Sequence, residues 1–370
     1  AWMQYPVGME FDPAQMRNIM KSFTEVALSP VAVNKFFHTV LSGWVLGAVF
    51  VVGVSSWFLL KKSNVAFAKD SMKIASWVGL AGIVLTIWTG DGSAVQVAKV
   101  QPMKLAAMEG LYDGSRGQSL VAFGLLNPDK QRTDSKPAIL GEISIPKGLS
   151  ILANHDADSF VPGINDLING IAIDEKGDTV NTVSYAERIA RGRKAQQALR
   201  EYDLAMQTGD KTGMAAAAEA IKADFKYFGY GYLESPDEAV PPVALTFYAF
   251  RIMVMGGGYL LAFFVMMLLL SYRKPGTLEN RWVAFLGLLT IPVVWIVSEA
   301  GWVTAEMGRQ PWTIEGLLPT RAAVSDISAG SVQLTFWMFV VVFVGLLVAE
   351  VSIMTREIAK ASKKDILTGE

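Results

Sequence analysis

The sequence predicts an all-α integral membrane protein: a bundle of five spanning helices with one large domain outside the membrane. Of its 370 residues, 52% are hydrophobic and only 18% are charged, which is too apolar a balance for an ordinary soluble domain. Five apolar stretches are long enough, or nearly so, to cross the roughly 30 Å hydrocarbon layer. A polar, turn-rich run separates the second stretch from the third and is too long for a loop.

The five apolar stretches set the expected organisation of the chain. They cover residues 36–60, 74–89, 243–272, 282–302 and 332–354, and the second is the shortest. The expected parts are therefore an outer segment (1–35), two spans (36–89), an outer domain (90–242), three spans (243–356) and a cytoplasmic tail (357–370). Within the outer domain, we expect turn-rich sequence to about residue 178 and then helices near 185–205 and 215–228.

Basic residues indicate how the chain is oriented in the membrane. Lysines and arginines follow the first, third and fifth spans, and these three segments lie on one side of the bilayer: Lys61, Lys62, Lys69, Lys73; Arg273, Lys274, Arg281; Arg356, Lys360, Lys363, Lys364. By the positive-inside rule this side is the cytoplasm. The outer domain and the loop 308–329 are then expected outside.

Composition limits the chemistry that the chain can support. It has no cysteine, which excludes disulfides, thiolate metal sites, cysteine-held iron–sulfur clusters and covalently attached haem. A redox centre would need His, Met or carboxylate ligands, and imidazole comes only from His38 and from His155, which is expected in solvent. The net charge of −1 and the lack of a basic, aromatic-rich stretch argue against a nucleic acid partner.

The segment 298–312 holds the densest group of functional side chains. Four of them recur at steps of three, four and three, which gives one helical stripe if the helix continues through Gly308: Glu299, Trp302, Glu306 and Arg309. Carboxylates in spanning helices usually mark ion, proton or cofactor sites. The alternative is a helix end at the membrane surface, with a solvated ion pair and an aromatic anchor.

His38 and Met253 are candidate ligands of a haem iron. Topology places both in the outer half of the membrane, and an imidazole with a thioether is a common axial pair. Arg251 lies two residues before Met253, on another face of the helix, where it could neutralise a haem propionate or an anion in a quinol site. The alternatives are a packing histidine, a gap-filling methionine and an arginine that reaches the interface.

A short segment after the second span carries a lysine and a carboxylate. Pro102 suits the first turn of a helix on which Lys104 and Glu109 are separated by about 140°. A carboxylate base and an ammonium donor would serve quinol oxidation, which needs a proton acceptor and a group that holds the ring oxygens. The alternative is a pair of charged residues on an ordinary interfacial helix.

Four motifs give the sequence a family resemblance. GWVTAEMGRQPW (301–312), QPMKLAAMEG (101–110), FRIMV (250–254) and KFFHTVLSGWVLGAVF (35–50) resemble subunit I of the cytochrome bd type quinol oxidases. The resemblance extends over nearly the whole chain and includes WMQYPVG (2–8), and the first motif is highly specific.

The resemblance implies a role for each candidate residue. His38 and Met253 would be the axial ligands of a low-spin b haem with Arg251 beside it, and Glu306 would ligate a high-spin b haem. A d haem, or a second b-type haem in its place, would form the oxygen site. The remaining residues would belong to the outer quinol-binding loop (Lys104, Glu109) or lie against the haems (Trp302, Arg309).

The resemblance also implies the function: a quinol:oxygen oxidoreductase of the bacterial or archaeal plasma membrane. Quinol would be oxidised at the outer face, electrons would reduce oxygen to water, and a proton motive force would result. Subunit II and small single-span subunits would be partners. Members of this family have about four further N-terminal spans, about nine in all, with a haem-ligating histidine among them, so an N-terminal portion is expected to be missing here.

Two other functions compete with this interpretation. One is a haem-containing quinol dehydrogenase that passes its electrons to a different acceptor. The other belongs to a different class: a proton or ion transporter whose path is lined by Glu299, Glu306 and Arg309.

Overall fold

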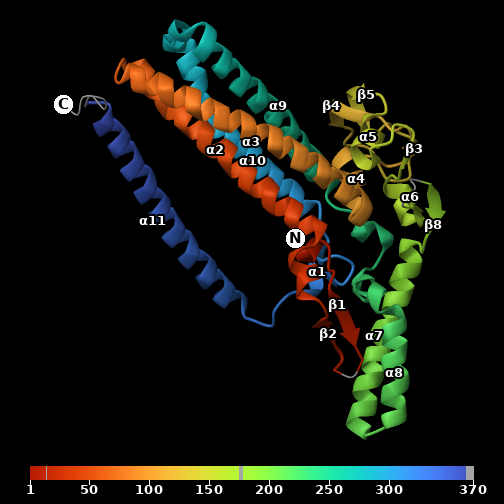
Figure 1. Ribbon diagram of the computed structural model, residues 1–370. Helices are drawn as coiled ribbons and strands as arrows, with labels where there is room; N and C mark the ends of the chain where they lie inside the picture. Colours follow the sequence, from red (N-terminus) through yellow and green to blue (C-terminus); the bar gives the residue numbers. More distant parts are fainter. Residues whose placement is uncertain (14, 175–177, 364–370) are drawn as a thin grey trace. The chain divides into compact units, whose positions relative to one another are not determined.

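The computed structural model describes residues 1–13, 15–174 and 178–363. Within these ranges, five helices are long and apolar enough to cross a membrane, which confirms the predicted fold class (Figure 1). They are α2 (Pro30–Lys61), α3 (Val65–Val100), α9 (Val243–Arg273), α10 (Arg281–Met307) and α11 (Ala329–Ala361).

All five helices extend beyond the apolar stretches that predicted them. α2 begins at Pro30, α3 continues to Val100 and α11 to Ala361, so the expected part boundaries at 35/36, 89/90 and 356/357 fall inside helices. The reason is that hydropathy reports where a helix is buried in lipid, whereas backbone hydrogen bonds continue through polar sequence. Lys69 and Lys73 accordingly lie in α3 and not in a loop.

The chain divides into two compact units. The first comprises Ala1–Thr39, Ile87–Val254 and Ser298–Ala323, and the second comprises Val40–Thr86, Met255–Val297 and the described residues from Val324 onward. Each unit has its own hydrophobic core, and the candidate site residues belong to the first unit.

The second unit is built from helices packed at close range. Its core includes Val52, Met72, Phe264 and Met267, all fully buried. A Cβ added at Gly79 would meet the ring of Phe264 at 2.1 Å, so the absence of a side chain there lets two helices approach closely. By contrast, no residue of α11 is buried.

The first unit combines short helices with small antiparallel sheets. Its α-helices other than the spans are α1 (Phe23–Ala27), α4 (Pro102–Glu109), α5 (Gly148–Asn154), α6 (Ile164–Ile168), α7 (Tyr185–Thr208) and α8 (Lys211–Asp224). The strand pairs are β1 (Met9–Asp12) with β2 (Arg17–Met20), β3 (Ser115–Arg116) with β6 (Phe160–Val161), β4 (Leu120–Leu126) with β5 (Ile139–Ile145), β7 (Ile171–Ile173) with β8 (Thr179–Asn181), and β9 (Trp312–Ile314) with β10 (Leu318–Pro319).

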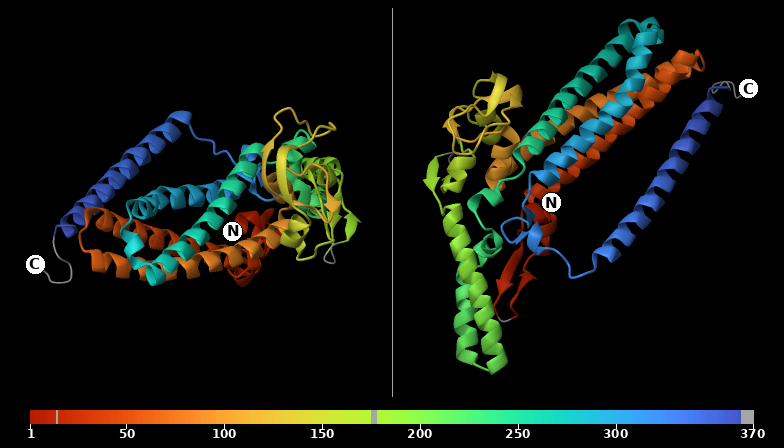
Figure 2. Two further views of the ribbon diagram at one scale, coloured as in Figure 1. Left: turned by 90° about the horizontal axis from the view of Figure 1, so that it is seen from above. Right: turned by 180° about the vertical axis from the view of Figure 1, so that it is seen from behind.

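Five short 3-10 helices lie between the longer elements of the described chain. They are η1 (Trp2–Gln4), η2 (Phe225–Tyr232), η3 (Pro236–Ala239) and η5 (Thr320–Ala322) in the first unit and η4 (Pro275–Glu279) in the second. The hairpin of α7 and α8 agrees with the two helices predicted near 185–205 and 215–228, and the right view of Figure 2 shows its helices side by side. Its ends follow from capping: Ser184 accepts from Glu187 N, Gly209 ends α7 in the left-handed region, and the Asp210 carboxylate caps α8.

Candidate functional site

Helix α4 places Lys104 and Glu109 in the interior of the first unit. Pro102 begins the helix, as predicted, and Gly110 ends it in the left-handed region at φ 61°. Every residue from Met103 to Glu109 is buried. Neither charge is therefore left in solvent within the unit, and burial of a lysine and a glutamate is costly unless partners compensate for it.

Glu109 and Arg251 form a buried ion pair. The Arg251 Nη2 atom donates to Glu109 Oε2 at 2.8 Å, and the two residues are 7% and 3% exposed. The same guanidinium also donates to the carbonyl oxygens of Met108 and Val121, and it lies 3.6 Å from the centre of the Phe247 ring. The arginine expected beside a haem propionate or a bound anion thus holds the carboxylate of α4.

One oxygen of the buried carboxylate lacks a hydrogen-bond partner among the described residues. That atom is Glu109 Oε1, and within the same residues Arg251 Nε also has no hydrogen-bond partner. Burial raises the pKa of Glu109, and the nearby Arg251 charge opposes that rise. The result is a carboxyl group that can hold or release a proton and has one oxygen available for a ligand.

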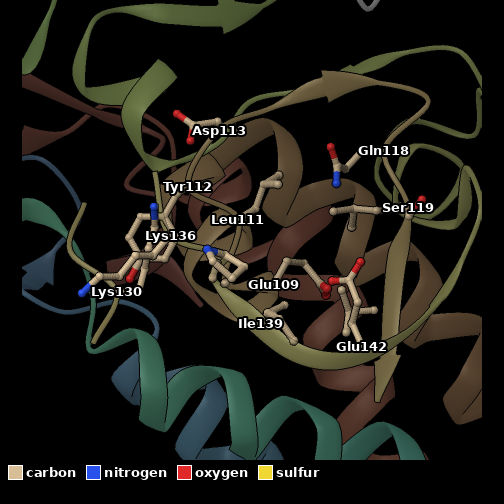
Figure 3. Close-up of a pocket in the computed structure, with 15 residues that line it drawn as sticks. Glu109, Leu111, Tyr112, Asp113, Gln118, Ser119, Lys130, Lys136, Ile139 and Glu142 are labelled. Carbon is tan, nitrogen blue, oxygen red and sulfur yellow. The ribbon is translucent and has the colours of Figure 1, made fainter. Parts of the chain in front are cut away.

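Glu109 contributes to the wall of a cavity of about 430 Å³ (Figure 3). Apolar side chains and polar groups both line it: Leu111, Val121, Ile139, Tyr112, Gln118 and Glu142. Figure 3 shows Glu109, Ile139 and Glu142 on one side of it in that view. A cavity of this size and mixed lining suits a small ring compound with polar substituents.

Lys104 and Glu109 contact different parts of the structure, as their angular separation on the helix predicts: Glu109 pairs with Arg251, whereas Lys104 contacts Ala305. Its Nζ donates to Ala305 O at 3.2 Å, and burial, followed by the nearby charge of Lys35, lowers the pKa of Lys104 to about 7. Beside it, Gln101 Nε2 donates to Glu315 Oε2 at 2.9 Å. Burial raises the pKa of Glu315 to about 7.

Sequence reasoning missed Glu315. It lies between the short strands β9 and β10, where neither helical spacing nor a family motif distinguishes it from a surface glutamate. Only the folded structure brings it to Gln101 and into electrostatic contact with Lys104.

The lowered pKa of Lys104 gives a prediction for stability. Between about pH 7 and 10.5 the unfolded chain binds the proton that the folded chain has lost, so the folded state gains stability as the pH rises through this window. Below about pH 7, Lys104 is charged in the folded protein, whose stability is then lowered by the full desolvation cost of a buried ammonium. Lys104→Met is therefore expected to raise the melting temperature most at pH 7 and below, with a gain that shrinks toward pH 10.

Thermal unfolding of the purified protein at several pH values measures this gain. Lys194→Met, at an exposed position on α7, is the matched control and should show no such trend. An equal gain from Lys104→Met at pH 6 and pH 10 would contradict the prediction.

His38 and Met253 are each packed against another helix of the first unit. The His38 Nδ1 atom is 3.0 Å from Thr89 Oγ1 in α3, and Met253 Sδ would lie 3.1 Å from a Cβ added at Gly301 in α10. A hydrogen bond at one ring nitrogen is the contact that commonly orients a metal-ligating histidine. These contacts leave both side chains compatible with a role as haem ligands.

The predicted stripe on α10 is partly wrong. The helix ends at Met307, so Arg309 lies beyond it: Gly308 follows the last helical residue, and Pro311 disfavours helical backbone at the residue before it. Arg309 still reaches back, with Nη2 at 2.7 Å from Glu306 Oε2. This ion pair is not fully solvated, since its side chains are 17% and 33% exposed, and Arg309 Nε is buried without a described partner.

The other two members of the stripe lie at the surface of the chain. Glu299 is exposed and Trp302 is 63% exposed. The four residues thus divide into an ion pair at the helix end and two exposed side chains. His155, expected in solvent, is also exposed and pairs with Asp91 Oδ2 at 3.0 Å.

Comparison with known proteins identifies the family. The sequence model of the cytochrome bd terminal oxidase subunit I family matches residues 1–362. The chain is 35% identical over 375 residues to the cytochrome bd-II ubiquinol oxidase subunit 1 of Escherichia coli (strain K12), covering 96% of this chain and 67% of that protein. It is 30% identical over 368 residues to the cytochrome bd ubiquinol oxidase subunit 1 of Bacillus subtilis (strain 168), covering 99% and 64%.

A solved structure supports the fold. The bd oxidase from Geobacillus thermodenitrificans matches with a TM-score of 0.70 at 21% identity, covering 97% of this chain and 65% of that one. The chain thus spans about two thirds of the length of these relatives. The expected resemblance is confirmed, and the enzyme class expected from it agrees with the names of the relatives. The chain belongs to the cytochrome bd terminal oxidase subunit I family.

Proposed function

We propose that this chain is the haem-bearing, quinol-oxidising subunit of a respiratory terminal oxidase. The observation that carries the proposal is the buried Glu109–Arg251 pair, whose unpartnered Glu109 Oε1 belongs to a residue of the cavity wall. The relatives at 35% and 30% identity over nearly the whole chain are named ubiquinol oxidases, which supports a quinol as the substrate class.

In this proposal Glu109 is the base that takes a proton from quinol. One ring hydroxyl donates to Glu109 Oε1, while Arg251 holds the other carboxylate oxygen and favours the charged form that can accept a proton. Apolar side chains such as Val121 and Ile139 would contact the ring. The raised pKa of the carboxyl group lets it retain the proton until the proton passes to solvent.

Lys104 has a role distinct from the one expected of it. It is not among the described residues that line the cavity, so a direct hydrogen bond to the ring oxygens has no support. Its ammonium contacts Ala305, the neighbour of Glu306, and interacts electrostatically with Glu306. We assign it to the electrostatic environment between the quinol cavity and the proposed haem ligands.

The donor set fits b-type haem. The axial ligands of the low-spin haem would be His38 and Met253, and Glu306 would ligate the high-spin haem. The hydrogen bond between the His38 ring and Thr89 would orient the imidazole. The half-buried Arg309, whose Nε has no hydrogen-bond partner among the described residues, offers a cation for a propionate. Bound haem would supply one-electron transfer from quinol and, with haem d or a further b-type haem, reduction of oxygen to water.

The remaining features of the proposal concern the whole complex. Subunit II and small single-span subunits are the proposed partners, the plasma membrane is the proposed location, and the quinol domain faces outward as the basic segments predict. Protons released outside and taken up from the cytoplasm would generate a proton motive force. The exposed Glu299 and the ion-paired Glu306 and Arg309 carry no separate argument for an ion path.

The test uses the intact complex purified from membranes. A pyridine haemochrome assay and a reduced-minus-oxidised spectrum should detect b-type haem, and quinol should drive oxygen uptake. Absence of haem, particularly with ion flux in liposomes, would overturn the proposal in favour of a transporter. Haem reduction by quinol without oxygen uptake would instead indicate a quinol dehydrogenase with another acceptor.

Gly301→Ala tests whether Met253 ligates the haem. The added Cβ would lie 3.1 Å from Met253 Sδ, so the thioether must shift by a few tenths of an ångström. We expect an altered low-spin haem spectrum and midpoint potential, with haem content retained. Gly258→Ala, where a Cβ meets nothing within 4 Å, is the matched control on α9. Identical spectra for both variants would count against the ligand assignment.

A further inference from the structure

The hairpin of β4 and β5 has two faces of different character because its register shifts twice. Phe123 pairs with Ile143 and Leu125 with Leu140, so that Gly124 faces two residues of β5, one of them Gly141 at φ +61°. Across this bulge the side chains of the two pairs stay on the same face of the hairpin, so Phe123, Ile143, Leu125 and Leu140 share one face. A second register shift, between Val121 and Phe123, places the side chain of Val121 on the opposite face.

One face of the hairpin carries five exposed apolar side chains. The exposed fractions are 52%, 57%, 44%, 65% and 52% for Phe123, Leu125, Leu140, Ile143 and Ile145, a set that we call the hairpin face. The opposite face includes Val121, Ile139 and Glu142, which line the cavity beside Glu109. The hairpin is thus a wall with the cavity on one side. A sheet face in contact with water would carry polar residues.

Hydrogen bonds attach this wall to the first turns of a membrane span. Val121 O accepts from Arg251 Nη2 at 3.1 Å, and Leu126 N donates to Tyr248 Oη at 3.0 Å. Both partners lie in α9, within the apolar segment Pro236–Arg273. Tyr248 and Arg251 are three residues apart, about 4.5 Å along the helix axis, so Val121 and Leu126 both lie near the depth of the first turns of α9.

Charged residues bound the hairpin face at both ends. The connection between the strands, next to Leu126, contains Asp129, Lys130, Arg132, Asp134 and Lys136. At the opposite end, Lys147 forms an ion pair with Asp158. An apolar band that lies at the depth of the first turns of a span, and that is bounded by charge, has the pattern of a surface that sits in the lipid interface.

We propose that the hairpin face lies in the outer leaflet of the lipid bilayer and forms the lipid-side wall of the Glu109 cavity. The lipid contact stands on the exposure, sidedness and hydrogen bonds given above. Its consequence for access rests on the proposed function: a lipid-soluble quinol reaches Glu109 from the bilayer by passing this wall, without crossing the water layer.

Site-directed spin labelling tests the lipid contact, and the absence of cysteine from this chain makes it specific. Phe123→Cys and Ile143→Cys are made in the intact complex, which is labelled with a nitroxide and reconstituted in phosphatidylcholine vesicles. The unsubstituted complex supplies the background labelling. Met206→Cys, at a 55% exposed position near the end of α7, is the matched control.

Power-saturation measurements then compare collisions with oxygen and with a water-soluble nickel chelate. Lipid contact predicts an oxygen-to-nickel collision ratio at 123 and 143 severalfold above that at 206. A ratio equal to that at 206 would place the face in water. Protection from both reagents would show that a protein subunit covers it. Either of these two results overturns the proposal.

A kinetic arm tests the access route and separates it from the proposed function. Phe123→Ser with Ile143→Ser should raise the KM for a long-chain quinol in vesicles severalfold and leave the KM for a short-chain, water-soluble quinol unchanged. Equal effects on both quinols would overturn the access route. If the unsubstituted complex oxidises neither quinol, the proposed function fails, and the labelling result still decides the lipid contact.

Discussion

Glu109→Gln is expected to lower quinol-driven oxygen uptake by about a hundredfold or more, the usual cost of losing a general base. The amide keeps the size of the carboxyl group and can still accept a hydrogen bond from Arg251, but it cannot take the quinol proton. Oxygen uptake driven by an artificial donor that reduces the haem directly should remain. The two rates, measured on the same purified complex, give the result.

The pH dependence of the same reaction provides a second readout. Because burial raises the pKa of Glu109, the base form is present only above that raised value, and quinol oxidation should increase as the pH rises through it. Glu109→Gln should remove this limb. Glu219→Gln, at an exposed position on α8, should keep both rate and profile. Loss of artificial-donor activity together with quinol activity would indicate structural damage and not loss of a base.

Met253→Leu is expected to abolish the low-spin haem signal in the reduced-minus-oxidised spectrum. Leucine has nearly the volume of methionine, so packing beside Gly301 should change little, at a cost below about 1.5 kcal/mol. The thioether sulfur that would bind iron is lost, however, and leucine has no ligand to replace it. Quinol-driven turnover should fall with the spectral signal.

Met255→Leu is the matched control for that substitution. Met255 lies on the same helix but is 55% exposed, so its replacement should leave the spectrum unchanged. An unchanged spectrum in Met253→Leu would show that the axial ligand has been misassigned. A loss of signal in both variants would point to a general effect on the helix and would also count against the assignment.

The sequence predicted the spans well because membrane burial is a local property. The free energy of transferring side chains into hydrocarbon is a sum over a window of about 20 residues, so each of the five windows could be assessed by itself. The same locality explains the errors: helix ends in polar sequence, such as α3 to Val100, leave no hydropathy signal. The stripe from Glu299 to Arg309 failed because it assumed a helix beyond Met307.

Contacts between distant segments could not be predicted in this way. Arg251 and Glu109 are separated by 142 positions, and helical spacing gives no information about which residue a guanidinium on one helix will reach on another. The unpartnered oxygen of Glu109, the surrounding cavity and the link from Gln101 to Glu315 likewise exist only once the outer domain has folded.

The sequence by itself determined that this chain crosses a membrane, that it lacks thiolate chemistry, and which residues could hold haem or a proton. Those conclusions depend on residue type and local order, which the chain specifies directly. Only the tertiary structure decided that Arg251 pairs with Glu109, that Lys104 turns away from the cavity, and that a hairpin with one apolar face closes it. These follow from the packing of distant segments, where burial changes the cost of every charge.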